Sequence, residues 1–252
     1  MRILKLSADY WNIRGSFKLG GLLDIGTQAS LLRLASGRFV LLDSLALDAP
    51  TLAAVRAATG NGADIEAILN LHPFHTVHVQ AAHQAFPQAK LYGTRRHVER
   101  FADLPWEAEL TESAELHARY ADDLAFSVPA GVDFVSANPN LHFASVLAYH
   151  RASGALHVDD TLMVMRLPGP LKALGTRVAF HPTLAPTLQR RAGAAQDFRD
   201  WAQGLIRDWG QARHLCAAHT HMLADAGPLG PRIEQALGRV RKTLARHEAK
   251  HG

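Results

Sequence analysis

The segment Ala67–Pro87, AILNLHPFHTVHVQAAHQAFP, decides how the rest of this sequence is interpreted. Its apolar run predicts a strand over Ile68–Leu71, and His72 follows that strand directly. Pro73 is a residue type that often occupies the first turn of a helix, and the pattern after it predicts a helix over Phe74–Phe86. The segment therefore predicts a strand, a histidine at its end and a following helix.

Four of the chain's 15 histidines lie in this segment. If the helix starts at Pro73, His72 and His75 can converge on one point beyond the strand, which is where α/β folds place their chemistry. His78 falls near the buried side and favours a hydrogen-bonded core histidine, whereas His83 is predicted to meet water. The predicted buried stripe consists of Phe74, Val77, Ala81 and Ala85.

Convergent histidines suggest a metal site. Neutral imidazole is a strong ligand for Zn, Fe and Mn, and water bound to such an ion ionises near pH 7. Three distant segments also place His or Asp beside predicted strands: His142 precedes FASVLAYH, Asp160 follows GALHV together with Asp159, and His219 follows HLCAA. Together these residues predict a mixed nitrogen and oxygen ligand set.

The remaining pattern predicts a mixed α/β layout. Ser36-Gly37 joins two strands by a tight turn and indicates antiparallel pairing, and the alternation of strands and helices after Asp43 indicates parallel crossovers. We expect one domain over residues 1–252, with a proline-rich loop at about 166–186 and a basic C-terminal helix at about 229–249. The predicted strands are Ser30–Leu34, Phe39–Leu42, Ile68–Leu71, Lys90–Tyr92, Val132–Ser136, Val146–His150 and Leu156–Val158; the predicted helices are Ala49–Ala58, Phe74–Phe86, Thr94–Phe101, Asp197–Trp209 and Leu229–Ala249.

Composition excludes several classes of protein. The chain has 252 residues, of which 48% are apolar and 20% charged, and its single cysteine, Cys216, makes sulfur chemistry a poor basis for function. No apolar run approaches the length of a membrane helix and the N-terminus lacks a secretory pattern, so we expect a cytoplasmic protein. The net charge of +4 comes entirely from the segment after Leu229, which argues against a pervasive nucleic-acid surface. The nucleophile-elbow, phosphate-loop and dinucleotide-binding motifs are absent from the sequence.

The order of these segments resembles the metallo-β-lactamase superfamily over roughly residues 20–223. That resemblance implies an αββα sandwich, two mixed sheets flanked by helices, and a metal-dependent hydrolase. It assigns His72 and His75 to the second and last histidines of the His-x-His-x-Asp-His motif, whose first histidine and aspartate are here Asn70 and Phe74. It further implies that the metal ligands are His72, His75, His142, Asp160 and His219. Asp159, His78 and His221 are near enough in sequence to replace one of them. In such a hydrolase, Asp160 or a nearby histidine is the candidate catalytic proton acceptor.

Because Phe74 cannot bind a metal and Asn70 is a weak ligand, the sequence favours one ion over two. We expect one divalent ion, Zn first, with Fe or Mn as alternatives, and a small-molecule substrate. Two further hypotheses stay open: a non-catalytic protein with this fold, and a nucleic-acid-processing protein that uses the basic terminal helix. The oligomeric state is open, and the apolar segment Leu167–Leu174 is a candidate interface.

Overall fold

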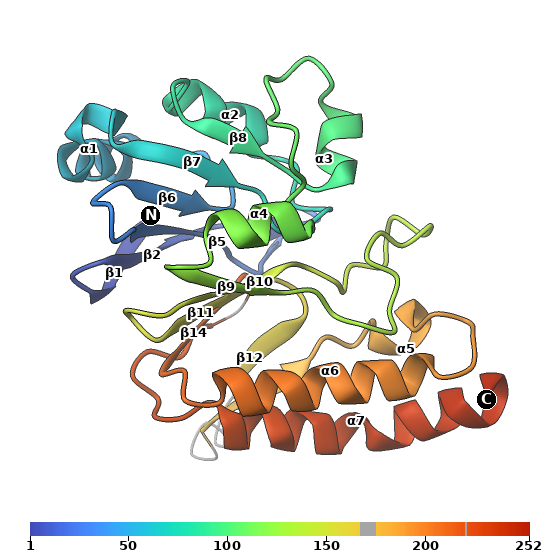
Figure 1. Ribbon diagram of the computed structural model, residues 1–252. Helices are drawn as coiled ribbons and strands as arrows, with labels where there is room; N and C mark the ends of the chain where they lie inside the picture. The colour runs from blue at the N-terminus through green and yellow to red at the C-terminus, as the bar shows by residue number, and fades with distance from the viewer. Residues whose placement is uncertain (167–174, 220) are drawn as a thin grey trace. The chain divides into compact units, whose positions relative to one another are not determined.

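The structure is a computed structural model and describes residues 1–166, 175–219 and 221–252 (Figure 1). Its contacts divide the chain into two compact units. The first comprises Met1–Ala125 with His150–Ser153, and the second comprises Phe126–Tyr149 with Gly154–Gly252. That residues 1–252 form one domain stays a prediction.

The first unit is built on a six-stranded mixed sheet of order β1-β2-β5-β6-β7-β8. Neighbours are antiparallel from β1 to β6, and β6, β7 and β8 are parallel, as the turn at Ser36-Gly37 and the later crossovers predict. The strands are β1 (Arg2–Ser7), β2 (Tyr10–Gly15), β5 (Thr27–Arg33), β6 (Phe39–Leu42), β7 (Ile65–Leu69) and β8 (Lys90–Tyr92), and a small hairpin consists of β3 (Lys18–Leu19) and β4 (Leu23–Asp24).

Helices of the first unit follow the parallel strands. α1 connects β6 to β7 and α2 connects β7 to β8, and both bury side chains in the same core cluster. The helices are α1 (Ala49–Ala58), α2 (Val79–Ala85), α3 (Arg95–Arg100) and α4 (Ala114–Arg119), with a short 3-10 turn at Gly60–Gly62. Members of the cluster that are essentially inaccessible to solvent include Ile13, Leu41, Val55, Ile65, Ile68 and Phe86.

The helix predicted over Phe74–Phe86 is wrong in its first turn, because α2 begins only at Val79. The preceding backbone is a turn. In it the amide of His75 donates to the carbonyl of His72, and the amide of Thr76 donates to the carbonyl of Phe74. Val77, predicted to be buried, is 70% exposed. Local hydrogen bonds thus replaced the helical pattern that the apolar spacing indicates.

The second unit contains a four-stranded sheet of order β14-β11-β10-β9, in which β11 and β14 are parallel. A separate antiparallel hairpin pairs β12 with β13. The strands are β9 (Leu124–Ser127), β10 (Leu147–His150), β11 (Ala155–Val158), β12 (Leu162–Arg166), β13 (Thr176–Phe180) and β14 (His214–Ala217). The buried Cys216 lies in β14.

Helices α6 (Ala194–Trp209) and α7 (Gly230–His251) pack side by side, and α7 also packs on β13 (Figure 1). The short helix α5 (Leu184–Thr187) precedes them. An aromatic group joins α6 to the hairpin, since the rings of Phe198 and Phe180 lie 5.1 Å apart between centroids and those of Phe198 and Trp201 lie 5.4 Å apart. Leu205 and Trp209, four residues apart, are also buried, so this side of α6 packs in the core.

Two other sequence predictions need correction. Val132–Ser136 is not a strand; only Val132 forms an isolated bridge, with Leu188. The predicted loop at 166–186 contains strand β13 and helix α5, because the alternating TRVAF pairs in register with Leu162–Arg166. The candidate interface Leu167–Leu174 lies outside the described residues.

No helix within the described ranges is long and apolar enough to cross a membrane. The cytoplasmic location stays a prediction.

Candidate functional site

The end of strand β7 positions His72 and His75. The two imidazole rings are stacked, with centroids 4.1 Å apart and planes 18° apart. His72 is fully buried and His75 is half-buried. The His-x-x-His spacing places both rings together although the backbone between them is a turn instead of the predicted helix.

A backbone hydrogen bond sets the protonation pattern of His72. The amide of Phe74 donates to Nδ1 of His72 at 3.0 Å. In the neutral ring Nδ1 is therefore the acceptor and Nε2 carries the proton. An ion bound at Nδ1 would compete with the amide directly, and one bound at Nε2 would require the proton to move to Nδ1. Either way, ligation by neutral His72 breaks this hydrogen bond.

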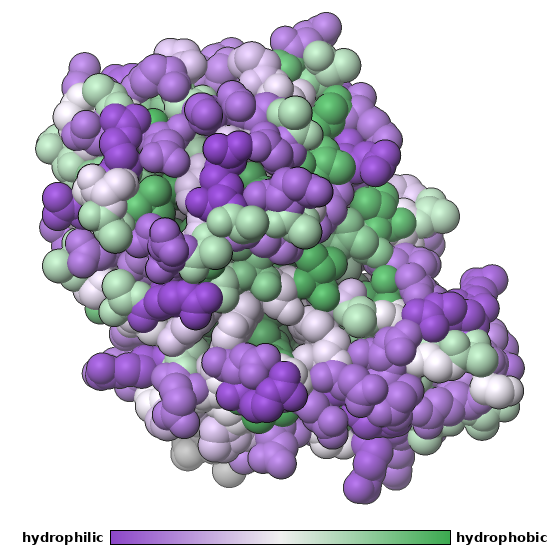
Figure 2. All heavy atoms as spheres, viewed as in Figure 1, coloured by the Kyte–Doolittle hydropathy of each residue, from purple (hydrophilic) through white to green (hydrophobic). Residues whose placement is uncertain are grey.

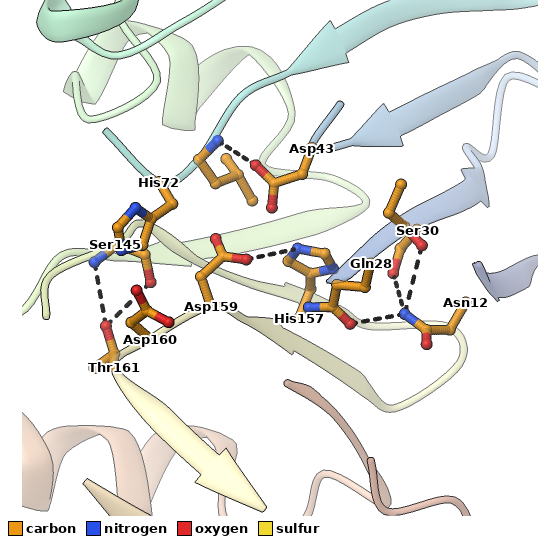
Figure 3. A network of polar contacts seen from close by, with 12 residues as sticks. Asn12, Gln28, Ser30, Asp43, His72, Ser145, His157, Asp159, Asp160 and Thr161 are labelled. Atoms are coloured by element: carbon orange, nitrogen blue, oxygen red, sulfur yellow. Dashed lines mark hydrogen bonds and ion pairs between the residues drawn. The ribbon is translucent and has the colours of Figure 1, made fainter. Parts of the chain in front are cut away.

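Asp43 fixes the backbone that leads to His72 (Figure 3). Its carboxylate Oδ1 accepts a hydrogen bond from the amide of Leu71 at 2.8 Å, and Asp43 itself has a positive φ of 58°. A non-glycine residue in this left-handed region is uncommon and is held there by its surroundings. The sequence pattern indicated only that a strand ends at Asp43 and gave no sign of this supporting role.

His97 holds the backbone of His75, a role that the sequence did not predict either. The Thr94 amide donates to Nδ1 of His97 at 3.3 Å, so in the neutral ring the proton is on Nε2, which lies 3.4 Å from the carbonyl oxygen of His75. Burial lowers the pKa of His97 to about 4, so the ring is neutral at physiological pH. His97 lies within a predicted helix, and no sequence signal linked it to His75.

Asn70 and Phe74 occupy the two motif positions that depart from the resemblance, and both have structural contacts. Buried Asn70 accepts from Ser44 Oγ at 2.6 Å through Oδ1 and donates to the Tyr92 carbonyl at 3.0 Å through Nδ2. The guanidinium of Arg96 lies 4.5 Å from the centroid of the Phe74 ring, a cation–π contact. Neither position offers a metal ligand.

In the second unit, two neighbouring parallel strands bring Asp160 and His219 together. Val158 of β11 is paired with Ala217 of β14, and the two side chains each come two residues after this pair. Nε2 of His219 lies 3.2 Å from Oδ1 of Asp160, which is only 3% exposed. Because parallel strands end at the same sheet edge, this pairing follows from the strand pattern and the sequence order.

A second polar pair in this unit is completely buried. Nε2 of His157 lies 3.9 Å from Oδ1 of Asp159, within the distance of an ion pair (Figure 3). The sequence indicated Asp159 as a substitute ligand but did not single out His157. The alternation of side chains along a strand could have indicated His157, because residues two apart, such as His157 and Asp159, share a face of the sheet.

His142 differs from the other predicted ligands because its ring is used by its own loop. Its Nε2 lies 2.6 Å from the carbonyl oxygen of Pro139, and its carbonyl accepts from Thr183 Oγ1 at 2.6 Å. Among the five predicted ligands, two pairs lie together within a unit, His72 with His75 and Asp160 with His219. His142 as a metal ligand stays a prediction.

No family model matches the chain, and no curated protein matches it. Solved structures of metallo-β-lactamases do match it. The enzyme from Erythrobacter litoralis has 16% identity and a TM-score of 0.59 over 95% of this chain and 96% of its own; that from Hirschia baltica has 13% identity and a TM-score of 0.59 over the same shares. The metallo-β-lactamase FIM-1 from Pseudomonas aeruginosa, in its mono-zinc form, has 12% identity and a TM-score of 0.57 over 95% of each chain.

The chain therefore has the metallo-β-lactamase fold, an α/β fold with two mixed sheets flanked by helices. At these identities the likeness extends to the fold alone. The resemblance inferred from the order of the sequence motifs is confirmed at that level.

Proposed function

We propose that this chain is a metal-dependent hydrolase that uses one divalent ion, with Zn as the first candidate and Fe or Mn as alternatives. The observation that carries the proposal is that each unit presents a close pair of donor side chains at strand ends, His72 with His75 and Asp160 with His219. Three imidazoles and one carboxylate form the kind of ligand set that these ions prefer. The metallo-β-lactamase fold supports the proposal, because one structural neighbour, FIM-1, is known in a mono-zinc form.

These four residues would hold the ion, and His142 is a fifth candidate. A bound divalent ion of this kind lowers the pKa of water and polarises a carbonyl or phosphoryl oxygen. The turn after β7 places His72 beside His75, and His97 lies against the carbonyl of His75; ligation by His72 would replace the hydrogen bond that its ring accepts from the Phe74 amide. Asp160 is the proposed proton acceptor, since its carboxylate lies beside His219 and is nearly inaccessible to solvent.

The proposal is limited to one ion by Asn70 and Phe74. A second ion would need ligands at these positions, but the Asn70 amide is bound to Ser44 and Tyr92 and the Phe74 ring to Arg96. The same observation favours the second candidate function, a non-catalytic protein of this fold. That candidate predicts binding of an ion without turnover, or little metal at all.

The proposed substrate is a small molecule with a hydrolysable carbonyl or phosphoryl group. One structural neighbour, the metallo-β-lactamase DIM-1, was exposed to ceftazidime, so a β-lactam belongs in the screen beside an ester, a lactone, a thioester and a phosphodiester. We expect Zn- or Mn-supplemented, untagged protein to hydrolyse at least one of them. We also expect His72→Ala and Asp160→Asn to lower the rate by about a hundredfold or more, because each removes a ligand or proton acceptor.

His83→Ala is the matched control, because it removes an imidazole from helix α2 that is not among the proposed ligands. It should retain the parent rate. Turnover that survives both His72→Ala and Asp160→Asn would contradict the hydrolase assignment. Stoichiometric metal without turnover on any of these substrates would favour the non-catalytic candidate.

A further inference from the structure

The second unit contains a pocket with a volume of about 900 Å³ that the proposed hydrolase site does not use. Three segments line it: the loop 133–141, residues 185–190 in and after α5, and the last turns of α7. Its size falls within the range of pockets that bind small organic ligands. Apolar side chains such as Leu141 and Leu188 form part of its wall.

Positive charge dominates the lining, and hydrophilic side chains also gather over this end of α7 in the space-filling view (Figure 2). Arg190, Arg246 and Lys250 face the pocket, and Asp133 is the one carboxylate among its lining residues. None of these three cations forms an ion pair within the part of the chain that the structure describes. The pocket therefore collects cations that the fold leaves uncompensated.

Two arginines in the second unit, Arg191 after α5 and Arg199 on α6, do form ion pairs. Arg191 pairs with Asp197, and Arg199 pairs with Glu248 at 3.0 Å. Within the described part of the chain, Arg241 and Lys242 on α7 also form no ion pair, so the pocket differs in gathering three such cations, from two segments, around one cavity.

Two histidines add hydrogen-bond donors to this group. His247 and His251 lie one helical turn apart on α7, with ring centroids 4.6 Å apart, and both line the pocket. Cations in the last turn of a helix also offset its dipole, which would explain Lys250 and His251 without a ligand. That explanation does not cover Arg190, which comes from another segment and lines the same pocket.

The residues HEAKH over 247–251 match the spacing of a metal-binding His-Glu-x-x-His helix, but the surroundings argue against a metal. Glu248 is paired with Arg199 and is not available as a base. Burial, His247, Lys250 and Arg190 all lower the pKa of His251, so these neighbours disfavour a protonated ring at that position. An anion is favoured by the same charges.

We propose that this pocket binds a phosphorylated small molecule of about nucleotide size. Guanidinium groups bind phosphate oxygens through two parallel hydrogen bonds, and Arg190 and Arg246 supply two such groups. Lys250 and the imidazoles add donors, and the apolar wall contacts the organic part of the ligand. The proposal does not depend on the hydrolase site, because every lining residue belongs to the second unit and none is a proposed metal ligand.

Isothermal titration calorimetry with ADP in EDTA tests the proposal on the full chain. We expect saturable binding, with no heat from uncharged adenosine and weaker binding of inorganic pyrophosphate. Arg246→Ala with Lys250→Ala should weaken ADP binding by about tenfold or more, because charge-assisted hydrogen bonds are lost. The matched control is Arg241→Ala with Lys242→Ala, which removes the same two charges from exposed positions of α7 outside the pocket and should change affinity by less than about threefold.

Three outcomes would overturn the proposal. One is no binding of ADP or pyrophosphate at millimolar concentration. Another is equal weakening of ADP binding by the pocket variant and the control variant, which would indicate general attraction to a basic helix. If a short oligonucleotide then binds more tightly than ADP and is weakened equally by both variants, the ligand is nucleic acid instead. The third is ADP binding that is absent in EDTA, appears only in a buffer with added Zn and no EDTA, and disappears in His247→Ala with His251→Ala; this result would assign a metal site.

Discussion

At the scale of single residues, Asn70 shows how a motif position can change from a metal ligand to a structural group. Its side chain is buried and bonded at both ends, to Ser44 and to the Tyr92 carbonyl, and its own carbonyl accepts from Thr111 Oγ1 at 2.9 Å. These hydrogen bonds join the end of strand β8 to the segment before His72. Asn70 thus stabilises the segment that leads to His72.

Asn70→Ala should therefore destabilise the protein, by about 2–4 kcal/mol, because buried polar partners lose their hydrogen bonds. Urea unfolding followed by circular dichroism measures the loss. The exposed loop residue Asn140 supplies the control, and Asn140→Ala should change the free energy of unfolding by less than about 0.5 kcal/mol. Equal stability of Asn70→Ala and the parent would refute the structural role.

The sequence could predict some of these residue roles and not others. His72 and His75 follow from their spacing after an apolar strand, and Asp160 and His219 from their places after two further strands. Asp43 and His97 act through backbone groups, an amide and a carbonyl, whose positions depend on the folded turn. No residue pattern encodes such contacts, so they became visible only in the structure.

At the scale of elements, Gly131 allows the loop after β9 to approach the start of helix α6. Its φ is +71°, and a Cβ there would lie 2.0 Å from the carbonyl oxygen of Ala194. Gly227 has nearly the same φ, +72°, but a Cβ at that residue would meet no atom within 4 Å. Comparing substitutions at these two glycines therefore separates the cost of backbone strain from the cost of steric contact.

Gly131→Ala should cost about 3 kcal/mol or more, since the strain of a positive φ is added to a clash with helix backbone. Gly227→Ala should cost only about 1–2 kcal/mol, the strain alone. Thermal or urea unfolding of both variants gives the comparison. If the two variants are equally stable, the close approach at Gly131 is wrong.

The start of helix α1 gives a prediction for acid pH. Hydrogen bonds from the N-terminal ammonium of Met1 and from the Thr51 hydroxyl and amide lower the pKa of Asp48 from 3.8 to about 2. A lowered folded-state pKa adds stability that is complete above 3.8 and is lost as the pH falls through about 2. Asp48→Asn should therefore be less stable than the parent at pH 6, and the gap in urea midpoint should narrow between pH 4 and pH 2. A gap independent of pH would contradict this assignment.

Elements could be predicted where the pattern is local and regular. Helix α1 and strands β6 and β8 have the predicted bounds, because each is a short run between turn signals. The prediction of a helix directly after Pro73 was wrong, because hydrogen bonds of His72 and Phe74 form a different turn there. Strand β13 was not predicted because it pairs with β12, and part of the proline-rich segment separates the two strands in the sequence.

At the scale of the whole molecule, the order of motifs along the chain was enough to predict the metallo-β-lactamase fold. Five positions in sequence order carried that resemblance, although the sequence identity to solved structures of the fold is only 12–16%. The order of motifs does not establish ion binding, because Asn70 and Phe74 depart from the motif at two ligand positions. We propose one ion that is served by both pairs.

Elemental analysis of untagged protein tests this single-ion site most directly. It should be made in a His247→Ala, His251→Ala background, so that the histidine pair of α7 adds no metal. We predict about one equivalent of Zn, Fe or Mn per chain, and its loss on adding either His72→Ala or Asp160→Ala, because each removes a ligand from a different pair. Less than about a tenth of an equivalent after metal-supplemented growth, or full retention in either variant, would contradict the single-ion site.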